Sequence, residues 1–548
     1  MNSCRALLFI TLLFWGQIAL AQKLQASFDH RGVVSLSYGG VSLVDLRARR
    51  GDAFSVGGYE LGGKSGWGET GKNESWDDAK RILSWTWSWG SVSCQFTGVN
   101  GSDALQLMIK IVNKSSEALD SIAIFPLGLQ YPALPKGFGA PNYPQFRNNL
   151  DAPALIAADF GSGMMVVADE DAKPLYVGLS PSGAPNHYKL EVGTSNDNSK
   201  GFLSRAVPVH RPVPPGQTDS YTISLRFAPP GREARAIADD VLKNYSRAWP
   251  QTLRWPDRRP IGELFLTDPT SSPRADISPN PRNYNFTKEI NIQTAGGKTA
   301  FREALLSYAD RSVQLLRGMH AQGAIVWDLE GQQYPQPDTS YAGDPGLLPK
   351  LSPEMDAVAD EFFKRFKDAG LGCGLTIRPQ RLDFSSSPPR QKDVPTGEQA
   401  AVMIGKMKYA QKRWGCNIFY VDSDGGPNDA TAPSIFAQVL EKLPGVLIIP
   451  ENIWPKDYAY TAPLASYTAP YKALHTPSDI KAIWPQAFTV TYIGDAPNHD
   501  LKRNEHNPQQ WEELQEAVRR GDILTFRAWF DDEPLNSQVR ELYREIKR

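Results

Sequence analysis

Between residues 258 and 532, a short apolar run that ends in a carboxylate or another polar side chain recurs about eight times. Most of these runs follow a stretch with helical periodicity, and strands that alternate with helices predict βα units around a parallel sheet. About eight such units in about 290 residues is the size of a (β/α)8 barrel. The clearest runs are IGELFLTD (261–268), AIVWDLEG (324–331), CGLTIRPQ (373–380), NIFYVDSD (417–424), VLIIPENIW (446–454), FTVTYIGD (488–495) and DILTFRAWFDD (522–532).

The helices of the barrel are predicted between these runs. One of them begins with Ser352 as a cap and Pro353 at the first helical position, which is typical of a helix start. The sixth strand is the least regular and is placed within APLASYTAPYKAL (462–474). The predicted helices are 299–323, 352–370, 396–414, 431–443, 477–484 and 507–520, and the eighth strand leads into PLNSQVRELYREIKR.

The chain before the barrel has a different pattern. Short alternating segments such as SYTISLRF (220–227) are broken by Gly, Asn, Asp and Pro. This alternation predicts antiparallel strands with one buried face, hence a β-sandwich. We therefore predict an α/β fold: a (β/α)8 TIM barrel over 261–548, preceded by an antiparallel β-sandwich domain over 22–230. A linker over 231–260, with one helix, joins the two.

Residues 1–21 are typical of a secretory signal peptide. Arg5 precedes an apolar stretch from Ala6 to Trp15, and the small-residue ending Ala19-Leu20-Ala21 comes before Gln22. No other run approaches the roughly 18 apolar residues of a membrane-spanning helix. We therefore expect a secreted or periplasmic protein without a membrane partner.

The cysteine count and the charge balance argue against several classes of protein. An odd number of cysteines remains after the leader, which rules out a complete disulfide framework. Cys373 and Cys416 lie near the starts of neighbouring strands and could approach each other, although two buried thiols are the favoured interpretation. The balance of 59 basic against 60 acidic side chains argues against nucleic acid as a partner. Oligomeric state has no signature in the sequence.

No organic cofactor or metal is expected. No Cys/His spacing is that of a zinc site, and the chain has only 7 His. The segment DSDGGPND (422–429) could alternatively hold calcium through its carboxylates, although it lacks the twelfth-position Glu of an EF-hand loop.

The strongest catalytic candidates are Asp422, which ends the fourth strand, and Glu451, which ends the fifth. Active sites of (β/α)8 barrels lie at the C-terminal ends of the strands. Hydrolysis of a glycosidic bond needs two carboxyl groups, about 5–5.5 Å apart in retaining enzymes and about 6.5–9.5 Å apart in inverting ones. Since neighbouring strands are about 4.8 Å apart, this pair can meet either distance. Asp424 is an alternative nucleophile, and each acid could instead only cap its loop.

An Asp at the end of the fourth strand followed by a Glu at the end of the fifth resembles the layout of retaining α-glycosidases. The α-amylase clan, bacterial dextranases and endo-α-N-acetylgalactosaminidases share it. The resemblance implies that Asp422 is the nucleophile and Glu451 the general acid/base. The α-galactosidase clan is the main rival: it also uses an Asp of the fourth strand but takes its acid from the sixth, where this chain offers Tyr467 and Tyr471.

Further side chains are predicted to contact the substrate. Alternation places Asp328 and Glu330 on one side of the second strand and Trp327 on the other. These two acids could bind sugar hydroxyls or only shape the following loop. Arg378 could pair with Asp422 and keep it ionised, or form a structural ion pair. The remaining predicted contacts are Asp424, Trp454, Asp495, Trp529 and Asp531.

Acids and tryptophans gathered at one face of an exported barrel indicate a carbohydrate substrate. We predict a glycoside hydrolase that cleaves α-glycosidic bonds by double displacement, with a raised pKa for Glu451. Three alternatives stay open: an α-galactosidase-clan-like hydrolase with a different acid, a non-catalytic carbohydrate-binding protein and a polysaccharide lyase.

Overall fold

The computed structural model divides into two compact units, Met1–Pro250 and Gln251–Arg548. The boundary falls inside the segment 231–260, which we predict from the sequence to be a linker. The described residues are 24–46, 53–98, 103–130, 155–173, 175–181, 187–194, 211–267, 282–285, 290–332, 342–386, 389–423, 433–451, 455–465, 475–493, 508–527 and 533–546.

The first unit is built from antiparallel sheets. Within its described residues, one sheet has the order β12-β13-β16-β9-β8-β7-β6, a second β11-β15-β10-β4-β5 with β14 beside β15, and a third β1-β2-β3. The strands are β1 (Gln25–Asp29), β2 (Gly32–Tyr38), β3 (Val41–Asp45), β4 (Ser55–Leu61), β5 (Lys64–Ser65), β6 (Lys72–Asp77), β7 (Ile82–Trp87), β8 (Gly90–Thr97), β9 (Ala104–Asn113), β10 (Leu119–Phe125), β11 (Gly128–Gln130), β12 (Leu155–Asp159), β13 (Met164–Asp169), β14 (Tyr176–Pro181), β15 (His187–Thr194) and β16 (Thr218–Ala228).

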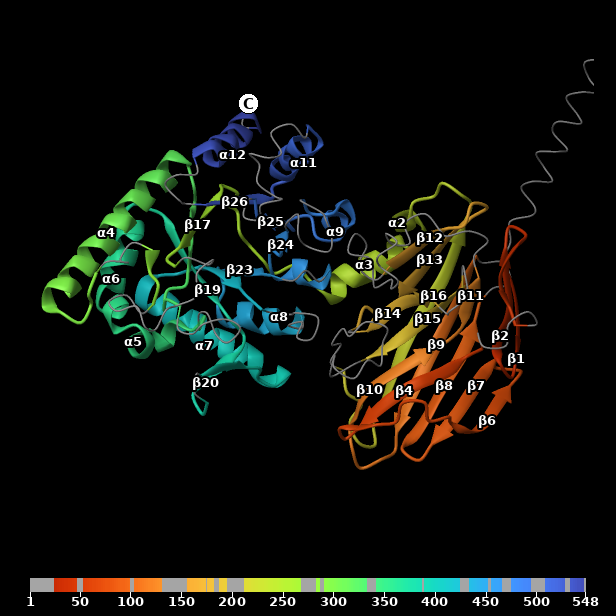
Figure 1. Cartoon of the computed structure of the whole chain (residues 1–548). Helices are drawn as coiled ribbons and strands as arrows, with labels where there is room; N and C mark the ends of the chain where they lie inside the picture. The colour runs from red at the N-terminus through yellow and green to blue at the C-terminus, as the bar shows by residue number, and fades with distance from the viewer. Residues whose placement is uncertain are drawn as a thin grey trace, which may run out of the picture. The chain divides into compact units, whose positions relative to one another are not determined.

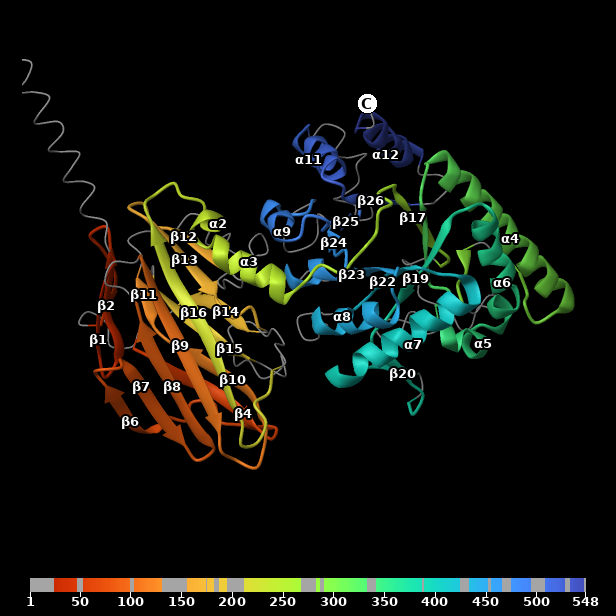
Figure 2. The same cartoon turned by 180° about the vertical axis from the view of Figure 1, so that it is seen from behind.

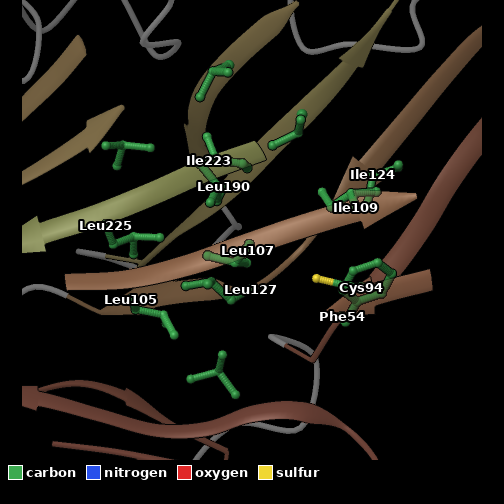
Figure 3. Packing of buried hydrophobic residues seen from close by; sticks show 14 of the residues in the cluster. Phe54, Cys94, Leu105, Leu107, Ile109, Ile124, Leu127, Leu190, Ile223 and Leu225 are labelled. Atoms are coloured by element: carbon green, nitrogen blue, oxygen red, sulfur yellow. The ribbon is translucent and has the colours of Figure 1, made fainter. Parts of the chain in front are cut away.

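The core of this unit follows from the alternation in the sequence. Every second residue of β8 is buried, and β9 buries Leu105, Leu107 and Ile109 completely. These side chains pack together with Ile223 and Leu225 of β16 (Figure 3). Because successive side chains of a strand point to opposite faces, one apolar face per strand is enough to build the core. The predicted antiparallel β domain is confirmed.

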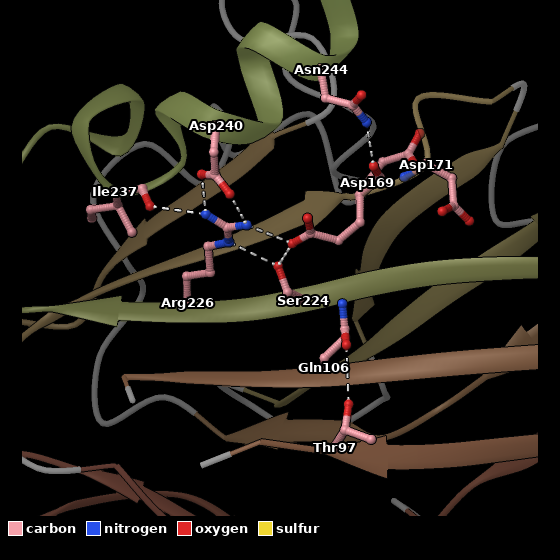
Figure 4. Close-up of polar contacts among 10 residues, drawn as sticks. Thr97, Gln106, Asp169, Asp171, Ser224, Arg226, Ile237, Asp240 and Asn244 are labelled. Atoms are coloured by element: carbon pink, nitrogen blue, oxygen red, sulfur yellow. Dashed lines mark hydrogen bonds and ion pairs between the residues drawn. The ribbon is translucent and has the colours of Figure 1, made fainter. Parts of the chain in front are cut away.

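Two short helices follow β16, where the sequence predicted one. They are α2 (Ala234–Ile237) and α3 (Asp239–Ala248), separated at Ala238 by a non-helical φ of −130°. Arg226 of β16 fixes this corner: its Nη2 donates to Glu170 at 2.8 Å and to Asp240 at 2.9 Å (Figure 4). The same guanidinium also donates to the carbonyl oxygen of Ile237. These bonds tie both short helices to the sheet.

The second unit is a nearly closed parallel barrel, as predicted. Its strand order is β23-β22-β19-β18-β17-β26-β25-β24, which is the order of a (β/α)8 barrel opened between the fifth and sixth strands. The amide of Ala462, just before β24, donates to Ile448 of β23 at 3.0 Å and bridges that opening. The strands are β17 (Ile261–Phe265), β18 (Gly323–Trp327), β19 (Gly372–Ile377), β22 (Ile418–Val421), β23 (Leu447–Pro450), β24 (Leu464–Ala465), β25 (Val490–Thr491) and β26 (Ile523–Arg527), with a hairpin of β20 (Arg381–Asp383) and β21 (Arg390–Lys392) after β19.

Helices α4, α6 and α7 lie on the outside of these strands (Figures 1 and 2). The helix α7 has the bounds that the sequence predicts and ends at Gly415, whose φ of +76° suits glycine. The helices are α4 (Ala295–Gly318), α5 (Leu348–Leu351), α6 (Pro353–Asp368), α7 (Thr396–Trp414), α8 (Pro433–Lys442), α9 (Ser478–Ile483), α11 (Pro508–Arg519) and α12 (Glu533–Ile546), with 3-10 turns η4 (Pro345–Leu347) and η5 (Pro455–Ala459).

The prediction that the first barrel helix ends at Gly323 is wrong. The helix α4 already ends at Gly318, and Gly323 is the first residue of β18, paired with both Ile261 and Gly372. A Cβ at position 323 would lie 2.3 Å from the carbonyl oxygen of Gly372. This glycine therefore permits the close approach of two strands and is not a helix cap.

The cysteines Cys94, Cys373 and Cys416 are free and buried, in agreement with the favoured interpretation. In the part of the chain that the structure describes, no helix has the length and apolar character needed to cross a membrane.

Candidate active site

Three polar residues continue the register of neighbouring strands at one end of the barrel. Ile377 of β19 pairs with Val421 of β22, which pairs with Pro450 of β23. The next residues along these strands are Arg378, Asp422 and Glu451. The amides of Asp422 and Glu451 donate to Ile377 and Val421 at 2.9 and 3.1 Å, which continues the ladder beyond the strands. The parallel register thus aligns a guanidinium and two carboxyl groups in one row.

The side chains of this row are connected. Arg378 donates through Nε to Oδ2 of Asp422 at 2.7 Å, and both side chains are largely buried, with 17% and 14% exposed. The backbone amide of Ser423 donates to Oε2 of Glu451 at 2.8 Å, and its hydroxyl lies 3.3 Å from Oδ2 of Asp422. Ser423 adopts a positive φ of +55°. One residue therefore contacts both carboxyl groups.

The Glu451 side chain is exposed at the mouth of the barrel. Even so, the protein atoms around its carboxyl group raise its pKa, and the negative charge of Asp422 adds to this effect. The hydrogen bond from Ser423 and the charge of Arg378 act in the opposite direction. A carboxyl group with a raised pKa keeps its proton to higher pH and can act as an acid near neutral pH.

Asp328 follows β18 at the same end of the barrel. Its φ is +58°, which is uncommon for a residue with a side chain, and its Oδ2 accepts a hydrogen bond from the Thr267 hydroxyl. Burial raises the pKa of Asp328 to about 6; the Thr267 bond lowers it and the charge of Asp422 raises it. Asp328 is thus a buried acid close enough to Asp422 for the two charges to interact.

Glu330 lies two residues further on and is almost completely buried. Its Oε1 accepts a hydrogen bond from the backbone amide of Asp344 at 2.8 Å. Burial raises the pKa of Glu330 to about 7, with a further contribution from the charge of Asp344. This hydrogen bond ties Glu330 to Asp344, the residue just before η4.

An aromatic cluster in the barrel lies two residues below the row of Arg378, Asp422 and Glu451. The half-buried indole of Trp327 stacks on Phe265 of β17, with ring centroids 5.2 Å apart, and contacts Tyr420 of β22 at 4.7 Å. The tryptophans predicted from the sequence to contact the substrate are Trp454 and Trp529, which lie outside the described residues, and this cluster was not predicted. The alternation within VWD and FYVD was the available signal, because it places Trp327 and Tyr420 on the inward face.

Several predicted site residues lie outside the described residues. They are Asp424, Trp454, Tyr467, Tyr471, Asp495, Trp529 and Asp531. Of the alternative calcium segment 422–429, the part after Ser423 also lies outside the described residues. Within the described ranges, no group of three or more His, Cys, Asp and Glu side chains is placed to hold a metal ion.

No family model and no curated protein matches this chain. Among solved structures, it is similar to the α-N-acetylgalactosaminidase NagBb from Bifidobacterium bifidum. In its complex with Gal-NHAc-DNJ, NagBb matches with a TM-score of 0.53 and 9% identity over 96% of this chain and 92% of that chain. The ligand-free form matches with a TM-score of 0.52 and 11% identity over 95% and 92%.

A more distant match is the GH36 α-galactosidase AgaA from Geobacillus stearothermophilus. Its TM-score is 0.45, with 10% identity over 86% of this chain and 68% of that chain. At such low identity, the likeness to NagBb establishes a common fold, and the more distant match adds nothing to it.

Proposed function

We propose that this protein is a retaining α-glycosidase in which Asp422 is the nucleophile and Glu451 the general acid/base. The observation that carries the proposal is the row of Arg378, Asp422 and Glu451 across three neighbouring strand ends. One carboxyl group is bound by a guanidinium. The other has a raised pKa, which favours the protonated form. Double displacement needs two carboxyl groups, one of which gives a proton to the glycosidic oxygen.

The reaction has two steps. In the first, the Asp422 carboxylate attacks the anomeric carbon while Glu451 gives its proton to the glycosidic oxygen, and the aglycone leaves. In the second, the Glu451 carboxylate takes a proton from water, whose oxygen attacks the anomeric carbon and releases Asp422. The hydrogen bond that the Ser423 backbone amide donates to Glu451 keeps the acid beside the nucleophile during both steps.

The proposed substrate is an α-linked sugar of the galactose type, carried either as N-acetylgalactosamine or as galactose. The name of NagBb supports this class, since that protein shares the fold. In this proposal the half-buried Trp327 packs against the face of a pyranose ring, and Asp328, the next residue in the chain, binds its hydroxyls.

The test is turnover by the full chain on p-nitrophenyl α- and β-glycosides of N-acetylgalactosamine, galactose and glucose, followed by α-linked polysaccharides. We expect activity on an α-linked substrate, and a loss of about a thousandfold or more in kcat for Asp422→Asn. The matched control is Asp424→Asn, which changes the alternative nucleophile. Proton NMR should show the α anomer as the first product, since double displacement retains configuration.

Other outcomes redirect the assignment. A first product of β configuration would mean inversion, and an unsaturated product absorbing in the ultraviolet would mean a lyase. Full activity of Glu451→Gln would move the acid to another strand, as in the α-galactosidase clan. Sugar binding without any turnover would favour the non-catalytic alternative.

A further inference from the structure

A lysine is buried beneath the strand ends that carry the site. Lys406 belongs to α7 and has only 5% of its surface exposed. Its Nζ donates to the carbonyl oxygens of Gly343, Arg378 and Gln380 at 3.2, 2.8 and 2.7 Å. An ammonium group has three donors, so all three are used. A buried charge is costly unless it is paired and hydrogen-bonded, and the Asp344 carboxylate lies 3.7 Å away.

Two of these carbonyls belong to residues whose side chains are connected by hydrogen bonds to the proposed catalytic acids. Arg378 binds Asp422 through its side chain. Gln380 donates through Nε2 to the carbonyl oxygen of Ser423 at 3.0 Å, and the Ser423 amide in turn binds Glu451. Lys406 therefore fixes the main chain at Arg378 and Gln380, the two residues whose side chains orient the site.

The third carbonyl, that of Gly343, accepts hydrogen bonds from both Lys406 and the main chain of Arg378. The Arg378 amide donates to Gly343 at 3.0 Å, so Lys406 and Arg378 share one acceptor. Gly343 has a φ of +58°, and a Cβ there would lie 2.8 Å from the Arg378 nitrogen. The packing around Arg378 thus has no room for even a methyl group.

We propose that Lys406 is a positioning residue, which holds the main chain just after β19 and at Gly343 so that Arg378 and Gln380 orient Asp422 and Ser423. That this orientation serves catalysis rests on the proposed function. Lys406 acts on the acids through other residues, and it does so with its three donors rather than with its charge alone.

The first test needs no substrate. Thermal unfolding of the full chain is measured for the wild type, Lys406→Met, Asp422→Asn and the double variant. Independent sites have additive effects, whereas sites joined by a network are coupled. We expect the Tm shift caused by Asp422→Asn to change by about half or more in the Lys406→Met background. Equal shifts in both backgrounds would overturn the proposal. Lys408→Met, an exposed lysine on the same helix, is the control and should leave the Asp422→Asn shift unchanged.

The second test measures kinetics. Misplacement of a reacting group by about 1 Å can cost about a hundredfold in rate, so Lys406→Met should lower kcat by about that factor and change KM by less than about threefold. Gly343→Ala displaces Arg378 without changing a charge and should give the same pattern. If Lys406→Met does not fold, Gly343→Ala replaces it in the unfolding cycle. An unchanged kcat in both variants would refute the positioning role, whereas a wild type without turnover refutes the proposed function and leaves the unfolding cycle to decide on Lys406.

Discussion

Asp328 should reduce the stability of the folded protein at neutral pH. Its carboxyl group is buried, and burial raises its pKa from the ordinary value of 3.8 to about 6. At low pH the group is protonated in both the folded and the unfolded chain and has no net effect. As the pH rises from 3.8 through about 6, the unfolded chain releases this proton more readily than the folded one, so stability is lost. Asp328→Asn should therefore stabilise the protein near pH 7.5 but not near pH 4.

The size of the effect follows from the two pKa values. They differ by about 2, and each pKa unit corresponds to about 1.4 kcal/mol, which gives roughly 3 kcal/mol above pH 6. The Asn side chain can still accept the hydrogen bond from Thr267 through its amide oxygen. Because Asp328 has only 7% of its surface exposed, solvent screening takes little from this value.

Urea-induced unfolding of the full chain, followed by tryptophan fluorescence at several pH values, measures the difference between variant and wild type. The expected gain grows between pH 4 and pH 6 and is constant above. Asp393→Asn, at an exposed position, controls for the removal of one negative charge. An equal gain at pH 4 and pH 7.5, or no gain at either, would refute the reasoning.

Three further results are expected. Glu451→Gln should lower kcat by about 10²–10⁴-fold, least for p-nitrophenyl leaving groups, and remove the alkaline limb of the pH–rate profile, because Glu451 has a raised pKa and loses its proton there. Trp327→Ala should raise KM roughly tenfold with a smaller change in kcat, since it removes about 1–2 kcal/mol of apolar contact; initial-rate kinetics will check it. Leu107→Ala removes a completely buried side chain and should cost about 2–5 kcal/mol of stability in urea unfolding.

The barrel could be predicted because each of its parts has a local cause. Alternating apolar runs and helical periods specify βα units, and Gly415 ends its helix by its left-handed conformation. The row of Arg378, Asp422 and Glu451 followed from one rule, that parallel strands end at the same face. The alignment itself is a long-range property: it depends on pairing between residues such as Ile377 and Val421.

What could not be predicted depends on contacts between distant residues. The pKa of Asp328 is set by burial and by Thr267, which is 61 positions away in the chain. The end of α4 was misplaced at Gly323 because a glycine that caps a helix and a glycine that admits a neighbouring strand look alike in the sequence. Local patterns do not distinguish these cases.

Lys406 was also missed, although the sequence holds a signal for it. Met403, Met407, Ala410 and Trp414 form the buried stripe of α7. At 100° per residue, Lys406 lies about 70° from the centre of that stripe, hence on its edge rather than on the solvent face. A lysine in this position either extends its amine past the apolar stripe to water or meets acceptors inside the protein. The helical pattern therefore leaves two possible environments for the Lys406 amine, water or acceptors inside the protein. The tertiary structure decides between them, because it brings backbone carbonyl groups around the amine.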